Sequence, residues 1–230
     1  MAKVLLLAAS GLARETLESI RQTGDHHVVG ILDDNAALHG TSVNGVPVLG
    51  GLDLAAGRNE LLMLCAGKGG SRAASARRLG LPDERYATHV SAHAVLGSSV
   101  SVEAGSIILA GTVATSDVQI GRHVVLMPRV VLTHDDILED YATLAAGTAL
   151  AGTVRVGREA YLGTNSTVRE NLTIGRGALL GMAAALITNL PAGETWAGNP
   201  ARPLGNGTSV TAPVPHTETL LNASLKEATR

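Results

Sequence analysis

Aliphatic residues recur every six positions through the second half of this 230-residue chain. Counting in sixes from Val90 to Leu186 gives seventeen positions, of which sixteen are Val, Ile or Leu and the other is Ala114. A second row, four residues after each of these, is mostly small or β-branched, and glycine often follows the aliphatic position. This period fits short strands joined by tight corners that stack coil upon coil, and it fits neither an α-helix nor long alternating strands. We therefore predict a parallel β-helix over residues 89–204.

The first part of the chain has a different pattern, in which apolar runs alternate with helical stretches. Ser10 follows the first apolar run and is expected to cap a helix whose apolar positions Leu12, Leu17 and Ile20 share a face. A second helical stretch is expected at 71–79. The predicted strands are 3–9, 27–32 and 61–66. Strands that alternate with helices predict a small parallel, Rossmann-like βαβ domain over residues 1–88.

Composition and charge exclude several classes of function. The net charge is −2 and the sequence pI about 6.4, so no basic field indicates a nucleic acid or an anionic membrane as partner. Cys65 is the only cysteine, which excludes a disulfide framework and a cysteine-based zinc site. The apolar start of the chain runs directly into a charged helical pattern, and no segment approaches the length of a membrane span. We expect a cytoplasmic protein that binds neither nucleic acid nor membrane.

One histidine of the eight stands out by its position. His134 occupies an outward position in the middle of the repeat and is followed by Asp135 and Asp136. Histidine can take up a proton at neutral pH, and a neighbouring carboxylate raises its basicity. Asp136 falls in an inner row that is normally small and uncharged, so either it faces the site and orients His134, or the coil is locally distorted. The other histidines are interpreted as structural or solvated.

The turn after the first strand is a candidate nucleotide site. Ser10-Gly11 precedes a helix, and Asp33-Asp34 ends the second strand. A helix start can bind a phosphate, and an acidic strand end can contact a base or ribose. The turn lacks the full G-x-G-x-x-G pattern, so an ordinary α/β turn with solvated aspartates remains the alternative.

The repeat resembles the hexapeptide-repeat acyltransferases, and residues 1–204 together resemble the bacterial sugar acetyltransferases within that family. These include sialic acid O-acetyltransferases and N-acetyltransferases of nucleotide-linked 4-amino-sugars. The matching motifs are Ala9-Ser10-Gly11, Leu32-Asp33-Asp34, Ala66-Gly67, Thr133-His134-Asp135, Leu162–Ser166 and Gly198–Ala201. The resemblance implies a left-handed β-helix, a homotrimer with active sites between subunits, acetyl-CoA as co-substrate and no metal.

The resemblance also assigns roles to residues. It implies His134 as general base, Asp135 as its carboxylate, and the backbone N–H of Gly152 as donor to the oxyanion. The positions implied for acetyl-CoA are Thr143, Gly152, Thr164, Gly181, Met182 and Arg202. Those implied for the nucleotide-sugar are Ser10, Gly11, Leu12, Asp33, Asp34 and Gly67. Leu12 and Thr143 stand where the family usually has histidines, so the contacts that those histidines make to the sugar nucleotide and to acetyl-CoA are not expected here.

We expect acetyl transfer from acetyl-CoA to the amino group of a nucleotide-linked amino-sugar, by direct attack on the thioester. O-acetylation of a sugar, as in the sialic acid enzymes, is the near alternative, and a non-catalytic sugar-nucleotide-binding homologue is a remote one. A γ-type carbonic anhydrase is excluded because its His-x4-His pair has no counterpart within the coils. Residues 205–230, rich in Thr, Ser, Asn and Pro, are interpreted as a C-terminal tail that is mobile or docked on a neighbour.

Overall fold

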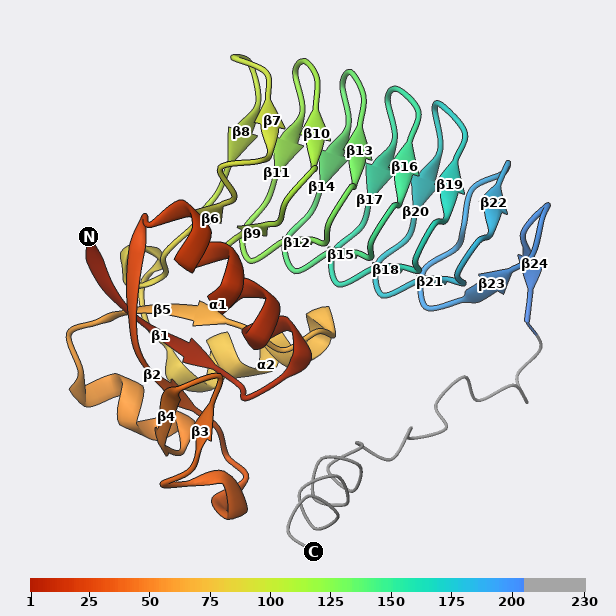
Figure 1. The fold of residues 1–230 in the computed structure, drawn as a ribbon. Coiled ribbons are helices and arrows are strands. Elements are labelled where there is room, and N and C mark those ends of the chain that lie inside the picture. The colour runs from red at the N-terminus through yellow and green to blue at the C-terminus, as the bar shows by residue number, and fades with distance from the viewer. Residues whose placement is uncertain (205–230) are drawn as a thin grey trace, which may run out of the picture.

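A small α/β domain is followed along the chain by a long stack of triangular coils (Figure 1). The computed structural model describes residues 1–204, and the predicted tail lies outside the described residues. Both predicted fold classes are confirmed, the α/β unit at the start and the parallel β-helix after it.

The α/β domain is built on a five-stranded sheet in the order β3-β4-β2-β1-β5. Its strands are β1 Ala2–Leu7, β2 His26–Leu32, β3 Ser42–Val43, β4 Val46–Gly50 and β5 Leu61–Leu64. Its helices are α1 Gly11–Thr23 and α2 Gly69–Leu79, with 3-10 turns η1 Ala36–Leu38, η2 Leu52–Gly57 and η3 Asp83–Arg85. All neighbouring strands are parallel except the hairpin β3–β4.

Helix α1 forms as its sequence predicts. The side chain of Ser10 accepts a hydrogen bond from the backbone N–H of Ala13, and Gly24 ends the helix in the left-handed conformation. The face with Leu12, Leu17 and Ile20 is buried. The hairpin β3–β4 was not predicted, although Asn44-Gly45 at its turn, both with positive φ, is a known hairpin signal.

The β-helix has three faces, and from β6 to β19 each strand pairs in parallel with the strand eighteen residues further along the chain. The first face holds β6 His89–Val90, β9 Ile107–Ile108, β12 Val125–Leu126, β15 Thr143–Leu144, β18 Tyr161–Leu162, β21 Leu179–Leu180, β23 Thr195–Ala197 and β24 Arg202–Pro203. The second holds β7 Val95–Leu96, β10 Val113–Ala114, β13 Val131–Leu132, β16 Ala149–Leu150, β19 Thr167–Val168 and β22 Ala185–Leu186. The third holds β8 Ser101–Val102, β11 Gln119–Ile120, β14 Ile137–Leu138, β17 Arg155–Val156 and β20 Thr173–Ile174.

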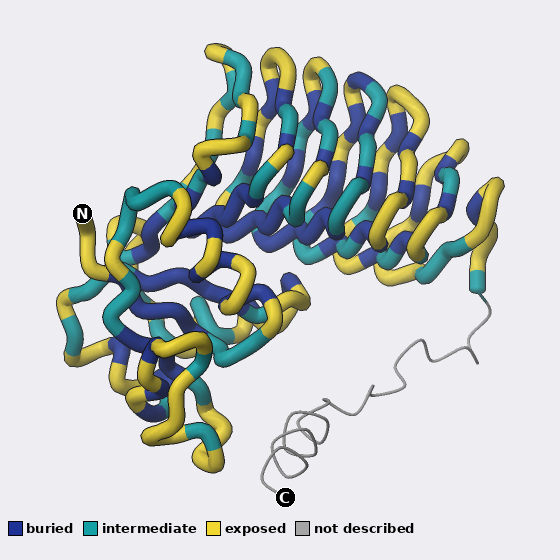
Figure 2. Tube along the Cα trace, viewed as in Figure 1, coloured by how far each residue is buried: buried dark blue, intermediate teal, exposed yellow. Residues whose placement is uncertain are grey.

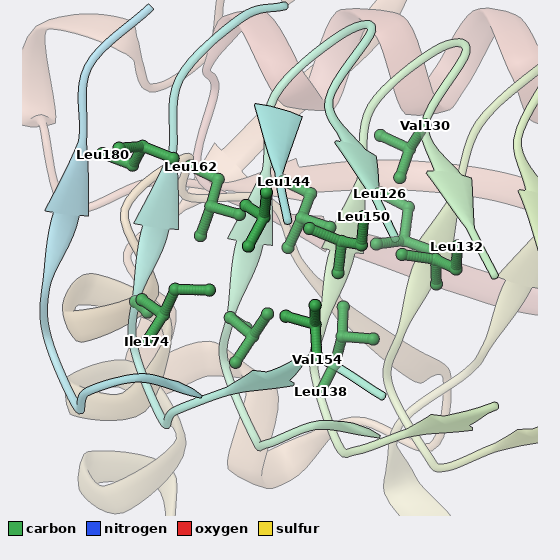
Figure 3. Packing of buried hydrophobic residues seen from close by; sticks show 14 of the residues in the cluster. Leu126, Val130, Leu132, Leu138, Leu144, Leu150, Val154, Leu162, Ile174 and Leu180 are labelled. Carbon is green, nitrogen blue, oxygen red and sulfur yellow. The ribbon is translucent and has the colours of Figure 1, made fainter. Parts of the chain in front are cut away.

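Three rows of corners join these faces. We call them the first corner (between the first and second faces), the second corner (between the second and third) and the third corner (between the third and first). The predicted aliphatic row points inward and is stacked between coils, as Leu126, Leu144 and Leu162 show in Figure 3. One residue per corner commonly has positive φ, such as Asp135 and Asn171, and this conformation suits Asn, Asp and Gly.

The α/β domain packs against the first face and the third corner. Ile107 and Val125, which point outward from the first face, are fully covered by the apolar core of the domain. Gly69 at the start of α2 lies so close to the carbonyl oxygen of Tyr141 that a Cβ atom there would overlap it. The second corner is therefore the edge of the triangular stack furthest from the chain's own α/β domain (Figure 1). Its turns are largely exposed, whereas the domain junction is buried (Figure 2).

Candidate active site

His134 projects from the second corner, in the turn between β13 and β14. Its side chain is 63% exposed, and its Nδ1 lies 2.8 Å from Oδ2 of Asp135. Because an ionised carboxylate can only accept, Nδ1 carries the proton and Nε2 is left with a free lone pair. The pair is therefore a proton acceptor with a fixed tautomer, open to solvent.

Gly152 lies directly beneath the imidazole, one coil further along the same corner. A Cβ atom at this position would overlap Cε1 and Nε2 of His134, so only glycine leaves room for the ring. The carbonyl of Gly152 accepts the N–H of Asn171 at 3.0 Å. Of the predicted catalytic residues, the structure thus brings His134, Asp135 and Gly152 together.

Asp136 points away from this pair into the core. It is fully buried, and its two carboxylate oxygens accept the backbone N–H groups of Thr133 and Val154, each at 2.9 Å. Of the two expectations for this residue, orientation of His134 by direct contact is wrong and local distortion of the coil is correct. Strands β13 and β16 pair only through Val131 and Ala149, whereas the strands of neighbouring coils pair through two residues.

Burial raises the pKa of Asp136 to about 6, because desolvation outweighs the two N–H donors. A carboxyl that titrates at 3.8 when unfolded binds its proton more tightly in the folded state, so its stabilising contribution is complete below pH 3.8 and lost above pH 6. Relative to Asp136→Asn, the wild type should lose roughly 3 kcal/mol as the pH rises through this window. Urea unfolding at several pH values measures the difference, and parallel stability curves would contradict it.

The positions implied for acetyl-CoA do not gather at one place in a single chain. Thr164, Gly181 and Met182 lie at the first corner, where Met182 is 76% exposed. Gly152 is at the second corner, and Arg202 is exposed on the terminal strand β24. The first and second corners are the two edges of the second face.

Thr143 lies apart from the other positions implied for acetyl-CoA. It is buried on the first face, under the α/β domain, where its hydroxyl donates to the carbonyl of Gly67 at 3.1 Å and accepts from Arg72. In this chain Thr143 therefore joins the two domains.

Several positions implied for the nucleotide-sugar meet at the carboxyl edge of the α/β sheet. The hydroxyl of Ser10 donates to the carbonyl of Cys65, and Asp33 accepts the N–H of Ala9 at 2.7 Å. Gly11 begins α1 between them, and Gly67 follows β5 with open space on its Cα. Strands β2 and β5 lie on opposite sides of β1, and such a switch point is the usual ligand site of parallel sheets.

Two of these positions are engaged elsewhere. The side chain of Leu12 is part of the core, so only its backbone remains available to a ligand. Asp34 is paired with Arg78 at 2.6 Å and accepts the N–H of Leu52. A shallow hollow of about 570 Å³ lies at the amino ends of β1 and β5, at the edge of the sheet away from this site.

Arg72 is a residue that the sequence analysis did not single out. It is fully buried and donates to the carbonyls of Ala66 and Gly67 in its own domain. Across the junction it donates to three carbonyls and one hydroxyl of the β-helix, those of His123, Tyr141, Ala142 and Thr143. No signal in the sequence separates it from the exposed arginines of the same helix.

Two histidines outside the site, His89 and His123, have structural roles, one of the two interpretations given to them from the sequence. His89 is buried between Asp25 and Ser19, and His123 is stacked against Tyr141. Within residues 1–204 no group of three or more His, Cys, Asp or Glu side chains could hold a metal ion. The same residues contain no helix of the length and apolar character that a membrane span requires.

Comparison with known proteins agrees with this architecture. Residues 3–63 match the family described as the PglD N-terminal domain. A UDP-3-O-acylglucosamine N-acyltransferase of Caulobacter sp. (strain K31) is 38% identical over 110 residues, which are 48% of this chain and 32% of that protein. An acyl-[acyl-carrier-protein]--UDP-N-acetylglucosamine O-acyltransferase of Stutzerimonas stutzeri (strain A1501) is 35% identical over 46% of this chain. The chain spans less than half the length of these curated relatives.

Solved structures match over most of the chain. A mutant perosamine N-acetyltransferase from Caulobacter crescentus, in complex with CoA and GDP-perosamine, has a TM-score of 0.82 at 27% identity and covers 90% of this chain and 98% of that one. The acetyltransferase domain of PglB from Neisseria gonorrhoeae FA1090, with acetyl coenzyme A, has a TM-score of 0.79 at 26% identity over 88% and 99%. In its α/β domain, its left-handed β-helix and the order of the two, the chain is similar to the sugar N-acetyltransferases among these solved structures.

Proposed function

We propose that the protein acetylates the amino group of a nucleotide-linked amino-sugar, with acetyl-CoA as donor and His134 as general base. The observation that carries the proposal is the exposed His134–Asp135 pair above Gly152. The neighbours with CoA and GDP-perosamine, or with acetyl coenzyme A, support the two ligands. Because acetyl-CoA is a metabolite of the cytoplasm, the same proposal places the protein there.

The chemistry needs one proton acceptor and one oxyanion donor. As the amine nitrogen attacks the thioester carbonyl, its proton passes to Nε2 of His134, while Asp135 stabilises the imidazolium through Nδ1. The backbone N–H of Gly152 donates to the oxyanion of the tetrahedral intermediate. When this collapses, the carbon–sulfur bond breaks and the imidazolium returns the proton to the CoA thiolate. The amide product and the free thiol account for every atom.

The α/β domain would hold the nucleotide. The N–H groups at the start of α1, beside Ser10 and Gly11, are suited to a phosphate of the sugar nucleotide. Asp33 keeps lone pairs for a base or ribose hydroxyl beyond its two backbone contacts. The open space at Gly67 leaves room for the ligand beside them.

This arrangement requires a second copy of the chain. The sugar-nucleotide edge lies in the α/β domain on the first face, whereas His134 is on the opposite edge of the triangle. The second face presents a mostly apolar outward row, which consists of Val95, Val113, Val131, Ala149, Thr167 and Ala185. We propose a homotrimer packed through this face, because it would bring the second corner of one chain beside the first corner of the next.

Mixed trimers test this assembly. Gly67→Trp should block the sugar site, and its Cβ atom has room because nothing lies within 4 Å of that position. His134→Ala and Gly67→Trp should each be inactive, yet co-expression should restore about one quarter of wild-type activity if subunits mix at random and each site takes one part from each of two chains. A mixture as inactive as its components would place the whole site within one chain.

The proposed activity is tested by thiol release from acetyl-CoA in the presence of GDP-, UDP- and dTDP-linked 4-amino-sugars. We expect release with at least one of them and an N-acetyl product by mass spectrometry. Acetylation of a hydroxyl instead would identify the O-acetyltransferase alternative. No release with any amino or hydroxyl acceptor, together with binding of the nucleotide-sugar, would indicate the non-catalytic homologue and contradict the proposal.

A further inference from the structure

Asp136 is an anomaly in the core row to which it belongs. The residues eighteen apart along this row are Val100, Val118, Asp136, Val154, Leu172 and Leu190. Asp136 is the charged member of a row that is otherwise aliphatic, and it is fully buried. Valine stands directly before and after it in the stack, so the core itself has no need of a carboxylate here.

The carboxylate replaces a regular backbone bond of the residue that precedes His134. In the adjacent coils, Thr115 and Ala151 donate their N–H groups to the carbonyl seventeen residues later, as the ladder requires. The N–H of Thr133, the equivalent residue, donates instead to Asp136. The carbonyl of Leu150, which would be its regular ladder acceptor, accepts the Thr133 hydroxyl at 3.2 Å. This is the interruption already described in the pairing of β13 with β16.

The second oxygen contacts the same corner one coil further along, where it accepts the N–H of Val154. The equivalent N–H groups of Val118 and Leu172 donate to no backbone carbonyl of the described residues. One carboxylate therefore holds the residue that precedes His134 and a residue two positions after Gly152.

We propose that Asp136 is a positioning residue for acetyl transfer, which sets the imidazole of His134 over the backbone of Gly152. The proposal rests on the function proposed above. Asp136 acts through the backbone of the two corners and touches neither substrate. Without the carboxylate, the N–H of Thr133 would be free to form the regular ladder bond to the carbonyl of Leu150, and the general base would move relative to the oxyanion donor.

The test is Asp136→Val, with Ser106→Val as its matched control. Ser106 is also buried and accepts the N–H eighteen residues later, that of Val124, but at the third corner, away from His134. Asp136→Val should unfold at a higher urea concentration than the wild type at pH 7.5, because a regular coil replaces a buried charge. Its kcat should fall by about tenfold to a hundredfold, with KM for both substrates within about twofold. Ser106→Val should keep kcat.

A wild-type kcat in a folded Asp136→Val would overturn the inference, and so would an equal loss of kcat in Ser106→Val. Should Asp136→Val not fold, Asp136→Asn serves, because its amide oxygen can still accept one of the two N–H groups. An intermediate kcat is then expected, and an unchanged kcat would again overturn the inference. Failure of the proposed function is distinct, because the wild type itself would then transfer no acetyl group.

Discussion

Replacement of His134 by alanine is expected to lower kcat by about 10²–10⁴-fold, the usual contribution of a general base. The imidazole is mostly exposed and its Nδ1 contacts Asp135, so the side chain contributes little to the core. Stability and subunit assembly should therefore be unchanged. Since the ring is assigned to proton transfer rather than to binding, KM for both substrates should change little.

His93→Ala is the matched control, because His93 is another exposed histidine in a turn of the same β-helix. Stopped assays of thiol release with the best acceptor from the nucleotide-sugar screen give kcat for both variants. A loss confined to His134→Ala supports the general base. Unchanged turnover in His134→Ala would show that the amine is deprotonated without it, and the mechanism would be wrong.

The sequence predicts the β-helix and the place of His134 for the same reason. Each coil buries one aliphatic side chain per hexad, and this demand is repeated without a break from Val90 to Leu186. A residue that falls between those positions, such as His134, must then point outward. The register also predicts that Asp136 points inward, because the next inner row includes it.

What the register does not predict is how an inward carboxylate finds its partners. Asp136 accepts the N–H of Thr133 in its own turn and the N–H of Val154 in the next coil. The second contact depends on atoms brought together only by stacking. The same holds for Thr143, whose sequence position matches an acetyl-CoA contact of the family but whose hydroxyl is buried against Gly67.

The contacts at the domain junction could not be predicted from the sequence either, because contacts between distant segments leave no periodic signal. Gly69 begins a helix in which small residues are common, yet it is needed for close approach to the carbonyl of Tyr141. Arg72 lies one turn further, and its sequence neighbours Arg77 and Arg78 are exposed. Three arginines in one helix are normally interpreted as a solvated face, yet one of them is a fully buried polar link between the domains.

Replacement of Arg72 by methionine should lower the free energy of unfolding by roughly 3–5 kcal/mol, because buried hydrogen-bond acceptors on both sides of the junction lose their donor. Burial lowers the pKa of Arg72 to about 10, so at neutral pH the guanidinium is charged and is compensated by the dipoles of carbonyl groups and of the Thr143 hydroxyl. Methionine fills a similar volume but donates nothing. The protein then loses stability because the buried carbonyl groups are left without a donor.

Arg77→Met is the control, since Arg77 is exposed in the same helix, and urea unfolding followed by circular dichroism compares the two variants. Equal midpoints would show that the junction does not depend on the guanidinium.

Loss of the Arg72 guanidinium should also affect substrate binding, at urea concentrations below those that unfold the protein. Arg72 holds the carbonyl of Gly67, beside the proposed sugar site, and Thr143 of the β-helix holds the same carbonyl. A loosened loop at Gly67 should therefore raise KM for the nucleotide-sugar more than KM for acetyl-CoA, so that the residue which joins the domains also shapes the proposed sugar site.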